Sequence, residues 1–214
     1  MPRDGALASS RRFRKRQATR DRLVACATEL FVDRGYDATS LDDIAEAADV
    51  AKGTLFNYFQ RKDDLVAAWV EERRLAIRQV LDELDPVTDT VETVRAMLAA
   101  LARLYEADVD VSRPMVRIWL QNGGPLLAEA SETAGLFAEV LRRGVASGEV
   151  LADLETSVAA RVFLDAYLGV LYRWAGARAV KKRALQSALF EMADVVLNGV
   201  IAPRNRTSVP RRTR

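Results

Sequence analysis

The stretch Ser40–Phe59, SLDDIAEAADVAKGTLFNYF, decides the fold of the first third of the chain. The apolar residues of its first half recur at i, i+3, i+4 and i+7, on one face of a helix: Leu41, Ile44, Ala45 and Ala48. Ser40 stands directly before this run and Asp43 follows three residues later, a spacing that predicts a capping box at the helix start. The apolar pattern breaks at Asp49, where we expect a turn.

The second half of the stretch predicts another short helix, from about Lys52 to Tyr58. Apolar side chains at Val50, Leu55 and Phe59 would form its back. The residues between them are small or can form hydrogen bonds: Lys52, Gly53, Thr54, Asn57 and Tyr58. A short helix with an apolar back and a polar front suits the DNA major groove, where side chains must reach base edges and phosphates. We therefore predict a helix-turn-helix whose second helix recognises DNA.

The sequence around this stretch resembles a known family. From Arg20 to Leu65 the chain contains ELFVDRGYDATS, LDDIAEAADV and AKGTLFNYFQRKDDL in that order, and it is similar to the N-terminal DNA-binding domain of TetR-type transcriptional regulators. The resemblance implies an all-α fold with an N-terminal three-helix helix-turn-helix domain and a C-terminal helical ligand-binding and dimerisation domain. It also implies a ligand-responsive repressor that binds a palindromic operator as a homodimer.

Three residues are the candidates for reading base edges: Lys52, Gly53 and Asn57. A lysine can bond guanine, an asparagine can pair with adenine through two hydrogen bonds, and a glycine permits close approach. The resemblance and the residue chemistry agree on these assignments.

Five further residues are candidates for phosphate contact: Thr39, Ser40, Thr54, Tyr58 and Lys62. Such contacts set the register of a protein on DNA without reading its sequence. Thr39 and Ser40 lie at the start of a predicted helix, whose free N–H groups can hold a phosphate, but their hydroxyls also serve as plain caps. The alternative for Lys62 is a solvated lysine at a helix start.

Three positions depart from the usual family pattern. Asp49 occupies the turn position where glycine is usual, and aspartate tolerates the left-handed region better than most residues. Ala51 stands where a Ser or Thr cap is common, a change that costs on the order of 1 kcal/mol of local stability. Phe56 replaces a frequent tyrosine and lacks its hydroxyl. Together these changes are expected to weaken DNA binding or to shift its preference.

Composition excludes several classes of function. The chain has no histidine and a single cysteine, Cys26, so we expect no metal site, no cofactor and no internal disulfide. No catalytic constellation is recognisable, and the protein is not expected to be an enzyme. No apolar run reaches the roughly 18 residues of a membrane span, and the polar, Arg-rich N-terminus does not resemble a secretory signal. A cytoplasmic protein is expected.

Charge and composition divide the chain into four parts. Residues 1–18 predict a disordered basic arm that contacts DNA, or alternatively a solvated tail, and residues 19–65 form the predicted DNA-binding domain. Residues 66–203 are the regulatory and dimerisation domain, and residues 204–214 a disordered basic tail. Lys and Arg outnumber Asp and Glu by 12 to 9 over residues 1–62, but acids lead by 21 to 15 over residues 63–203. This asymmetry suits a protein that meets DNA with one end.

Helical periodicity continues to the end of the regulatory domain. After Lys62 we predict helices that end near Asp85-Pro86 and that cover about 88–106, 113–121, 126–147, 156–178 and 180–200. In the resembled family the helix after Lys62 carries motion to the DNA heads. The last two helices carry more apolar residues than one face needs and are the predicted homodimer interface; the alternative is that both are buried within their own subunit.

The middle helices supply the candidates for a ligand pocket: Met97, Tyr105, Met115, Trp119, Phe137, Phe163 and Tyr167. Trp119 and Tyr167 are the first choices, since each combines an apolar ring with a polar group. Each of these residues could equally be ordinary core, and the sequence does not identify the effector.

Three alternatives to a ligand-responsive repressor stay open. A DNA-binding regulator could lack a small-molecule switch and respond to a partner protein or act constitutively. An all-helical enzyme would need paired carboxylates on one inward face, whereas Asp42-Asp43 and Glu71-Glu72 are adjacent and point in different directions on a helix. A scaffold protein would show no salt-dependent affinity for DNA.

Overall fold

The computed structural model describes residues 3–85, 88–122, 124–179 and 181–199. Over these ranges the chain forms nine α-helices and no β-strand, so the all-α prediction is confirmed. The helices are α1 (Arg3–Asp33), α2 (Leu41–Ala47), α3 (Lys52–Phe56), α4 (Lys62–Glu83), α5 (Thr90–Ala107), α6 (Val109–Gln121), α7 (Gly124–Ser147), α8 (Thr156–Gly176) and α9 (Ala184–Asn198). Among the described helices, none combines the length and the hydropathy of a membrane span.

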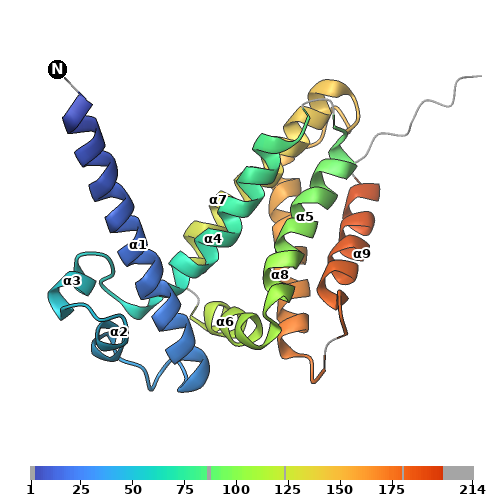
Figure 1. The fold of residues 1–214 in the computed structure, drawn as a ribbon. Coiled ribbons are helices and arrows are strands. Elements are labelled where there is room, and N and C mark those ends of the chain that lie inside the picture. The colour runs from blue at the N-terminus through green and yellow to red at the C-terminus, as the bar shows by residue number, and fades with distance from the viewer. Residues whose placement is uncertain (1–2, 86–87, 123, 180, 200–214) are drawn as a thin grey trace, which may run out of the picture.

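The helices form a small head and a larger body (Figure 1). Helices α1, α2 and α3 make the head, and the body consists of α4 to α9. Helix α4 begins at the head and runs along α7, while α6 lies across the end of the body that faces α1. The apolar core continues from head to body, because Leu65, Val66 and Trp69 at the start of α4 are buried beside the head.

The core of the head is built from one face of each of its helices. Buried side chains from α1, α2, α3 and the segment after α3 meet there: Leu23, Ala27, Phe31, Ile44, Leu55 and Phe59. Tyr36 adds its ring against Phe31, with the ring centroids 5.1 Å apart. The i, i+3, i+4 spacing of these residues in the sequence therefore corresponds to a packed three-helix core.

Helix α1 is longer than the sequence predicted. We expected residues 1–18 to be disordered, but α1 extends back to Arg3. Residues 6–33 contain no glycine or proline and are rich in Ala and Arg, which favour helix, so the helix can extend toward the N-terminus. Residues 1–2 and the predicted tail at 204–214 lie outside the described residues.

The predicted helices of the body occur with shifted ends. Helix α6 begins at Val109, four residues before its predicted start, because the Asp108 carboxylate caps it by accepting a hydrogen bond from the Val111 N–H at 3.1 Å. Helices α8 and α9 are each slightly shorter than predicted, and residue 180 between them is not described.

Candidate functional site

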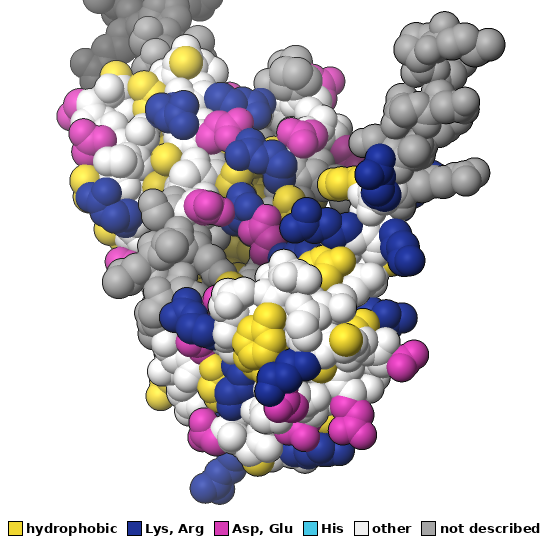
Figure 2. Space-filling view, turned by 90° about the vertical axis from the view of Figure 1, so that its left-hand side faces the viewer, with side chains coloured by type: hydrophobic (Ala, Val, Ile, Leu, Met, Phe, Trp, Pro, Cys, Tyr) yellow, Lys and Arg dark blue, Asp and Glu magenta, His cyan; other side chains and the backbone are white. Residues whose placement is uncertain are grey.

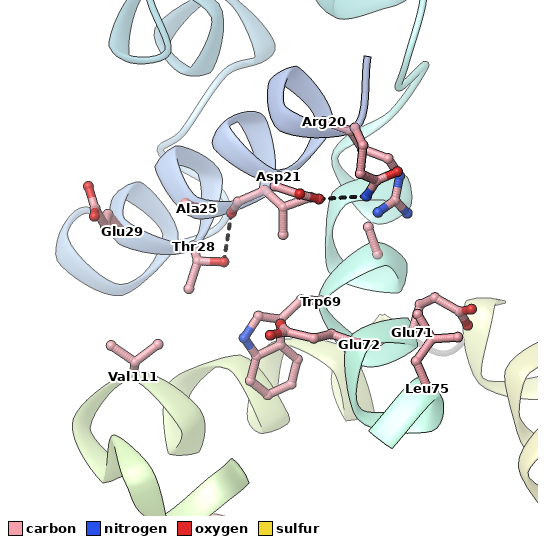
Figure 3. Close-up of a pocket in the computed structure, with 13 residues that line it drawn as sticks. Arg20, Asp21, Ala25, Thr28, Glu29, Trp69, Glu71, Glu72, Leu75 and Val111 are labelled. Atoms are coloured by element: carbon pink, nitrogen blue, oxygen red, sulfur yellow. Dashed lines mark hydrogen bonds between the residues drawn. The ribbon is translucent and has the colours of Figure 1, made fainter. Parts of the chain in front are cut away.

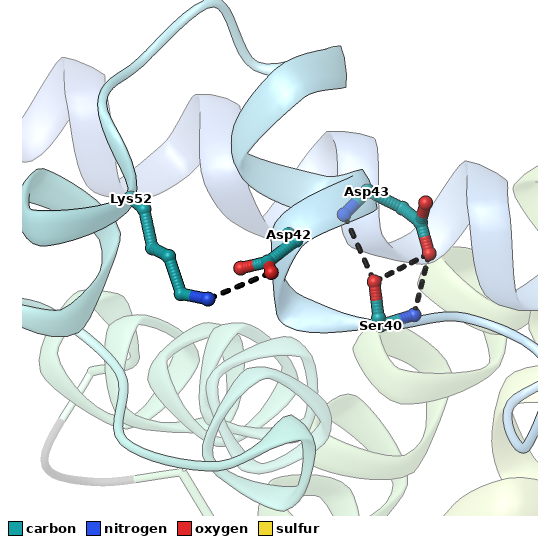
Figure 4. Close-up of polar contacts among 4 residues, drawn as sticks. All are labelled: Ser40, Asp42, Asp43 and Lys52. Atoms are coloured by element: carbon teal, nitrogen blue, oxygen red, sulfur yellow. Dashed lines mark hydrogen bonds and ion pairs between the residues drawn. The ribbon is translucent and has the colours of Figure 1, made fainter.

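The turn between α2 and α3 has the geometry of a helix-turn-helix. Ser40 caps α2, and its hydroxyl accepts a hydrogen bond from the Asp43 N–H at 3.1 Å while Asp43 accepts one from the Ser40 N–H at 2.8 Å (Figure 4). The predicted capping box is therefore present, and its hydrogen bonds lower the pKa of the Asp43 carboxyl. Asp49 adopts a φ of 50°, in the left-handed region, and so forms the turn despite replacing glycine.

Five of the eight DNA-contact candidates come together on one short segment. Lys52, Gly53 and Asn57 are exposed, while Thr54 and Tyr58 are half-buried. Leu55, on the opposite side of α3, is fully buried in the head core. The short helix thus presents a polar front and an apolar back, and none of the described atoms lies within 4 Å of a Cβ built on Gly53.

The Lys52 ammonium is held by a weak surface contact. Its Nζ lies 2.7 Å from Oδ2 of Asp42 on α2, and both side chains are about 60% exposed (Figure 4). An ion pair this exposed contributes roughly 0–1 kcal/mol, so it can be exchanged for another partner at little cost. The Ala51 position has no side-chain cap, as expected from the sequence.

Thr39 and Lys62 lie elsewhere, in contacts internal to the head. Thr39 is 2% exposed, and its hydroxyl donates to carbonyl oxygens at the end of α1, with Gly35 O at 2.9 Å. The Lys62 Nζ donates to Tyr36 O at 2.5 Å and lies 4.3 Å from the centroid of the Tyr36 ring. Their polar atoms therefore join the α1–α2 connection to the core and to α4. Ser40 is exposed, but its hydroxyl is engaged with Asp43.

A second contact at the same junction was not predicted from the sequence. The Tyr36 hydroxyl donates to Oδ1 of Asp63 in the first turn of α4. Burial and this hydrogen bond raise the pKa of Tyr36 well above its usual value. Tyr36, Lys62 and Asp63 together form a head–α4 clamp, which attaches the start of α4 to the head.

Basic side chains of α1 lie beside the α3 segment. The Arg16 guanidinium is 5.8 Å from the Tyr58 ring centroid, and that of Arg20 is 5.6 Å from the Phe59 ring. Residues 12–16, which include most of the predicted basic cluster, are exposed on α1; the side chain of Arg11 lies outside the described residues. Figure 2 looks onto this side of the molecule, where Lys and Arg alternate with Asp and Glu rather than forming one uniform basic field.

The predicted ligand-pocket residues are all buried in the body, and three of them line one cavity formed by described residues. Tyr105, Trp119 and Tyr167 line a cavity of about 20 Å³ between α4, α5, α6, α7 and α8. The other four residues are core side chains away from it: Met97, Met115, Phe137 and Phe163. Phe137 and Phe163 pack against each other with ring centroids 4.5 Å apart.

The cavity has two charged members that the sequence did not reveal, and one of them, Arg74 of α4, is paired with Glu71 and Glu132. The other is Arg73 of α4, although nothing in the local sequence distinguishes this arginine from the exposed charged residues around it. Its side chain is only 9% exposed.

A wider groove of about 570 Å³ separates the head from the body (Figure 3). Asp21 and Thr28 of α1 form one wall, Trp69 and Glu72 of α4 the other, and Val111 of α6 the floor. The Trp69 ring therefore faces the head groove, while its backbone carbonyl bonds to Arg73 of the inner cavity.

Comparison with known proteins assigns this architecture. Residues 23–69, which contain α2, α3 and the proposed base-reading residues, match the family described as bacterial regulatory proteins, tetR family. The transcriptional regulator MftR of Mycobacterium tuberculosis is 31% identical to the chain over 195 residues, which cover 89% of this chain and 96% of MftR. The chain belongs to the TetR family.

Other TetR-like proteins match nearly the whole chain. The transcriptional repressor KstR2 of Rhodococcus jostii is 29% identical over 202 residues, with 87% of this chain and 93% of KstR2 covered. Among solved structures, Thermus thermophilus FadR, a TetR-family transcriptional repressor in complex with lauroyl-CoA, superposes with a TM-score of 0.64 and 27% identity over 87% of this chain and 97% of FadR. The protein is a DNA-binding transcriptional regulator, and these relatives are regulators rather than enzymes.

Proposed function

We propose that this TetR-family regulator is a cytoplasmic repressor that binds a near-palindromic operator as a homodimer and releases it when a small effector binds. The observation that carries the DNA-binding part is the polar front of α3, held out from a core that buries Leu55. A helix of this kind enters the major groove, and two heads related by a two-fold axis read two half-sites.

The proposed contacts follow from the exposure of each side chain. Lys52, Gly53 and Asn57 meet base edges, and Lys52 exchanges its contact with Asp42 for the DNA. Thr54 and Tyr58, at the edge of this front, meet phosphates. We leave Thr39 and Lys62 out of the contact set, because the polar atoms of both already bond to α1 and Tyr36.

The homodimer is proposed to form through α8 and α9. One face of α8 is buried in its own subunit through Phe163, Tyr167 and Trp174. Large apolar side chains remain exposed on the other faces of these two helices: Val158, Val162, Tyr172 and Val195. Val195, the most exposed of them, is 76% exposed. Apolar side chains gathered on neighbouring helices are typical of surfaces that another protein covers.

The proposal that a small effector binds is supported by the structure of FadR, which was solved in complex with lauroyl-CoA. We propose that the effector of the present chain enters the cavity lined by Tyr105, Trp119 and Tyr167. At about 20 Å³ this cavity is far smaller than the roughly 300–1,000 Å³ of typical ligand pockets, so effector binding must open it.

The small size of the cavity also favours a second candidate function, a DNA-binding regulator without a small-molecule switch. Such a regulator would respond to a partner protein or act constitutively. Thermal unfolding in the presence of small molecules separates the two candidates: an effector that binds the native state raises the melting temperature, and a regulator without a switch shows no such shift.

Selection of random duplex DNA by the purified full-length protein tests the operator proposal. We expect enrichment of a two-fold symmetric site with half-sites about one helical turn apart, near 34–36 Å. The double variant Lys52→Ala/Asn57→Ala should fold normally, since both side chains are exposed, and should lose this enrichment. Failure of the wild-type protein to enrich any site at low salt would refute the proposed operator binding.

A further inference from the structure

Arg73 is a buried cation whose charge is poorly compensated. Its Nη1 donates to Trp69 O at 2.6 Å, and its guanidinium carbon lies 3.3 Å from the Trp69 ring centroid and 5.3 Å from that of Tyr105. Within the described part of the chain, Glu72 is the one carboxylate in contact, at 3.4 Å, and its side chain is 69% exposed. Aromatic faces and a solvated acid replace the buried partner that a guanidinium in a protein interior normally has.

The surroundings of Arg73 disfavour its charge. Burial lowers the pKa of the guanidinium from its ordinary value, although an arginine stays protonated at any physiological pH. Its Nε–H has no hydrogen-bond partner among the described residues. A buried cation in this state is destabilising by itself, so an anion that reached it would be bound more tightly than at the protein surface.

The cavity beside Arg73 offers further donors. Trp119 lines it, and the buried Nε1–H of Trp119 also has no partner in the described structure. The hydroxyl oxygens of Tyr105 and Tyr167 lie 3.3 Å apart, so one hydroxyl can donate to the other. Indole and guanidinium N–H groups are donors only, so the unpartnered Trp119 Nε1–H and Arg73 Nε–H can both donate to an acceptor that enters the cavity.

Apart from Thr133 and the paired Arg74, the remaining walls of the cavity are apolar. Val70, Ile77, Leu101, Leu164 and Leu168 surround the donor groups. This arrangement suits a molecule with one acceptor-rich anionic end and an apolar body. Because Arg74 is already paired with Glu71 and Glu132, the Arg73 guanidinium is left to balance one negative charge, whereas a phosphate monoester, which carries nearly two, would leave excess charge buried.

We infer that the effector of this regulator is an apolar monocarboxylate, whose carboxylate binds Arg73 and the Trp119 N–H and whose body packs against the apolar walls. This inference rests on the proposed function, which supplies the need for an effector. The closed cavity of about 20 Å³ has space for roughly one water molecule, so binding of the carboxylate and its apolar body requires the cavity to widen.

Trp69 links this site to the head. Its ring stacks on the Arg73 guanidinium on one side and lines the groove against α1 on the other (Figure 3). A carboxylate that draws the guanidinium away from the ring changes the support of Trp69 and therefore the contact between α4 and the head. The ligand thus binds the two arrangements of the head with different affinity, as an effector must.

The test compares acids with neutral molecules of the same shape. Decanoate and 4-phenylbutyrate are paired with decanamide and 4-phenylbutyramide, and thermal unfolding of the full-length protein is followed in each. At a concentration 100-fold above its dissociation constant, an acid should raise the melting temperature by about 5 °C or more, and its amide should do much less. Tryptophan fluorescence should change with the acids, since Trp69 and Trp119 adjoin the site.

Variants assign the preference to Arg73. Arg73→Met should keep or raise the melting temperature without ligand, because it removes a poorly compensated charge, and it should weaken acid binding by roughly tenfold or more while leaving amide binding unchanged. Arg73→Lys, which keeps the charge, should retain a weaker acid preference and serves as the test if the Met variant does not fold. Arg78→Met is the matched control, since Arg78 lies on the same helix and pairs with Glu139 at 2.9 Å outside the cavity.

Three results would overturn the inference. The first is equal stabilisation by acids and amides, and the second is an acid preference that survives in Arg73→Met. The third is a loss of the acid preference in Arg78→Met as large as that in Arg73→Met, which would mean that the preference follows the overall charge of α4 rather than Arg73. Operator selection is independent of all three, so a protein that binds its operator but shows no acid preference refutes this inference alone.

Discussion

The head of this protein exposes the polar residues proposed to bind DNA, whereas the body buries polar residues in its cavity. The head holds Lys52, Gly53 and Asn57 out toward solvent, with only one exposed ion pair to restrain them. The body turns Arg73 inward, where the ring of Trp69 covers it. The residues of the head are placed for a partner that arrives at the surface, whereas the body must open before a partner can reach its polar groups.

The two regions also differ in what they leave exposed. The front of α3 is polar, whereas α8 and α9 expose large apolar side chains at Val158, Val162, Tyr172 and Val195. A polar surface can stay exposed to water between binding events, whereas an apolar surface is stabilised when another protein permanently buries it. The difference agrees with the proposal of a reversible contact with DNA through α3 and a homodimer through α8 and α9.

The largest expected effect is the loss of the dimer in Val195→Glu. A carboxylate introduced at each copy of this position would have to be buried in the interface, so the dimer dissociation constant should rise by roughly a thousandfold. Sedimentation velocity measures the change. Leu75→Glu is the control. Leu75 is exposed on α4, and this substitution also introduces a carboxylate in place of an apolar side chain, but away from α8 and α9. A dimer that tolerated Val195→Glu would place the interface elsewhere.

Substitutions at two glycines test the contrast between the closely packed body and the exposed front of the head. A Cβ on Gly144 of α7 would lie 2.3 Å from Thr90 Oγ1 and 2.5 Å from Val150 Cγ2, so Gly144→Ala should destabilise the fold by about 1–3 kcal/mol. Gly53→Ala meets open space and should stabilise the head by up to about 1 kcal/mol, because alanine favours helix. The same Gly53 variant should bind operator more weakly, since its methyl group faces the DNA.

Urea unfolding of both glycine variants measures the change in stability, and operator binding by both measures the change in affinity. Equal stability changes in the two variants would contradict the contrast. A Gly53→Ala protein with unchanged operator affinity would remove Gly53 from the proposed DNA contacts.

Asn57→Ala tests whether the exposed front of the head reads sequence. The loss of a bidentate contact should cost roughly 1–3 kcal/mol for the preferred base at one position in each half-site, with little effect on other sequences. Thr54→Ala is the matched variant, and it should weaken binding uniformly across sequences. Binding to a library of single-base operator variants distinguishes the two patterns. An unchanged preference at every position in Asn57→Ala would exclude it from base readout.

The smallest effect concerns acid stability of the body. Glu149 accepts hydrogen bonds from the Thr90 N–H at 2.7 Å and the Thr90 hydroxyl at 2.8 Å, and these contacts lower the pKa of its carboxyl. Because the folded-state pKa lies below the unfolded value, the stabilisation is present above the unfolded pKa of about 4.3 and is lost as the pH falls through the folded pKa. Glu149→Gln should flatten the decline in unfolding free energy below pH 5 by less than about 1 kcal/mol. An equally steep decline in the variant would assign the acid sensitivity to other carboxyls.

The helix-turn-helix was predictable because its determinants are local. The capping box joins Ser40 to Asp43, and the apolar stripe repeats within two turns, so sequence spacing alone defines them. Lys62 and Thr39 were placed among the candidate DNA contacts from their residue types and the family resemblance, but in the structure Lys62 bonds to a carbonyl 26 residues earlier, and Thr39 bonds to carbonyls four and nine residues earlier. Sequence spacing gives no information about such contacts.

The cavity was only partly predictable for the same reason. Tyr105, Trp119 and Tyr167 were identified as apolar residues with polar groups, which is a property of each side chain by itself. Arg73 lines the cavity through the packing of α5, α6 and α7 against α4, and an arginine inside a helix is normally exposed. The length of α1 was underestimated because basic residues were interpreted as a solvated arm, although they are also good helix formers.

The head–α4 clamp joins the head rigidly to α4, so the two are expected to move together. Hydrogen bonds from Tyr36 to Asp63 and from Lys62 to Tyr36 attach the head to the first turn of a helix of 22 residues, about 33 Å long. A rotation of such a rod by about 5° about its far end moves the head by about 3 Å, close to the 3.4 Å rise of one base-pair step. With the head rigidly attached, a change of a few degrees deep in the body is sufficient to move α3 by one base pair along its operator.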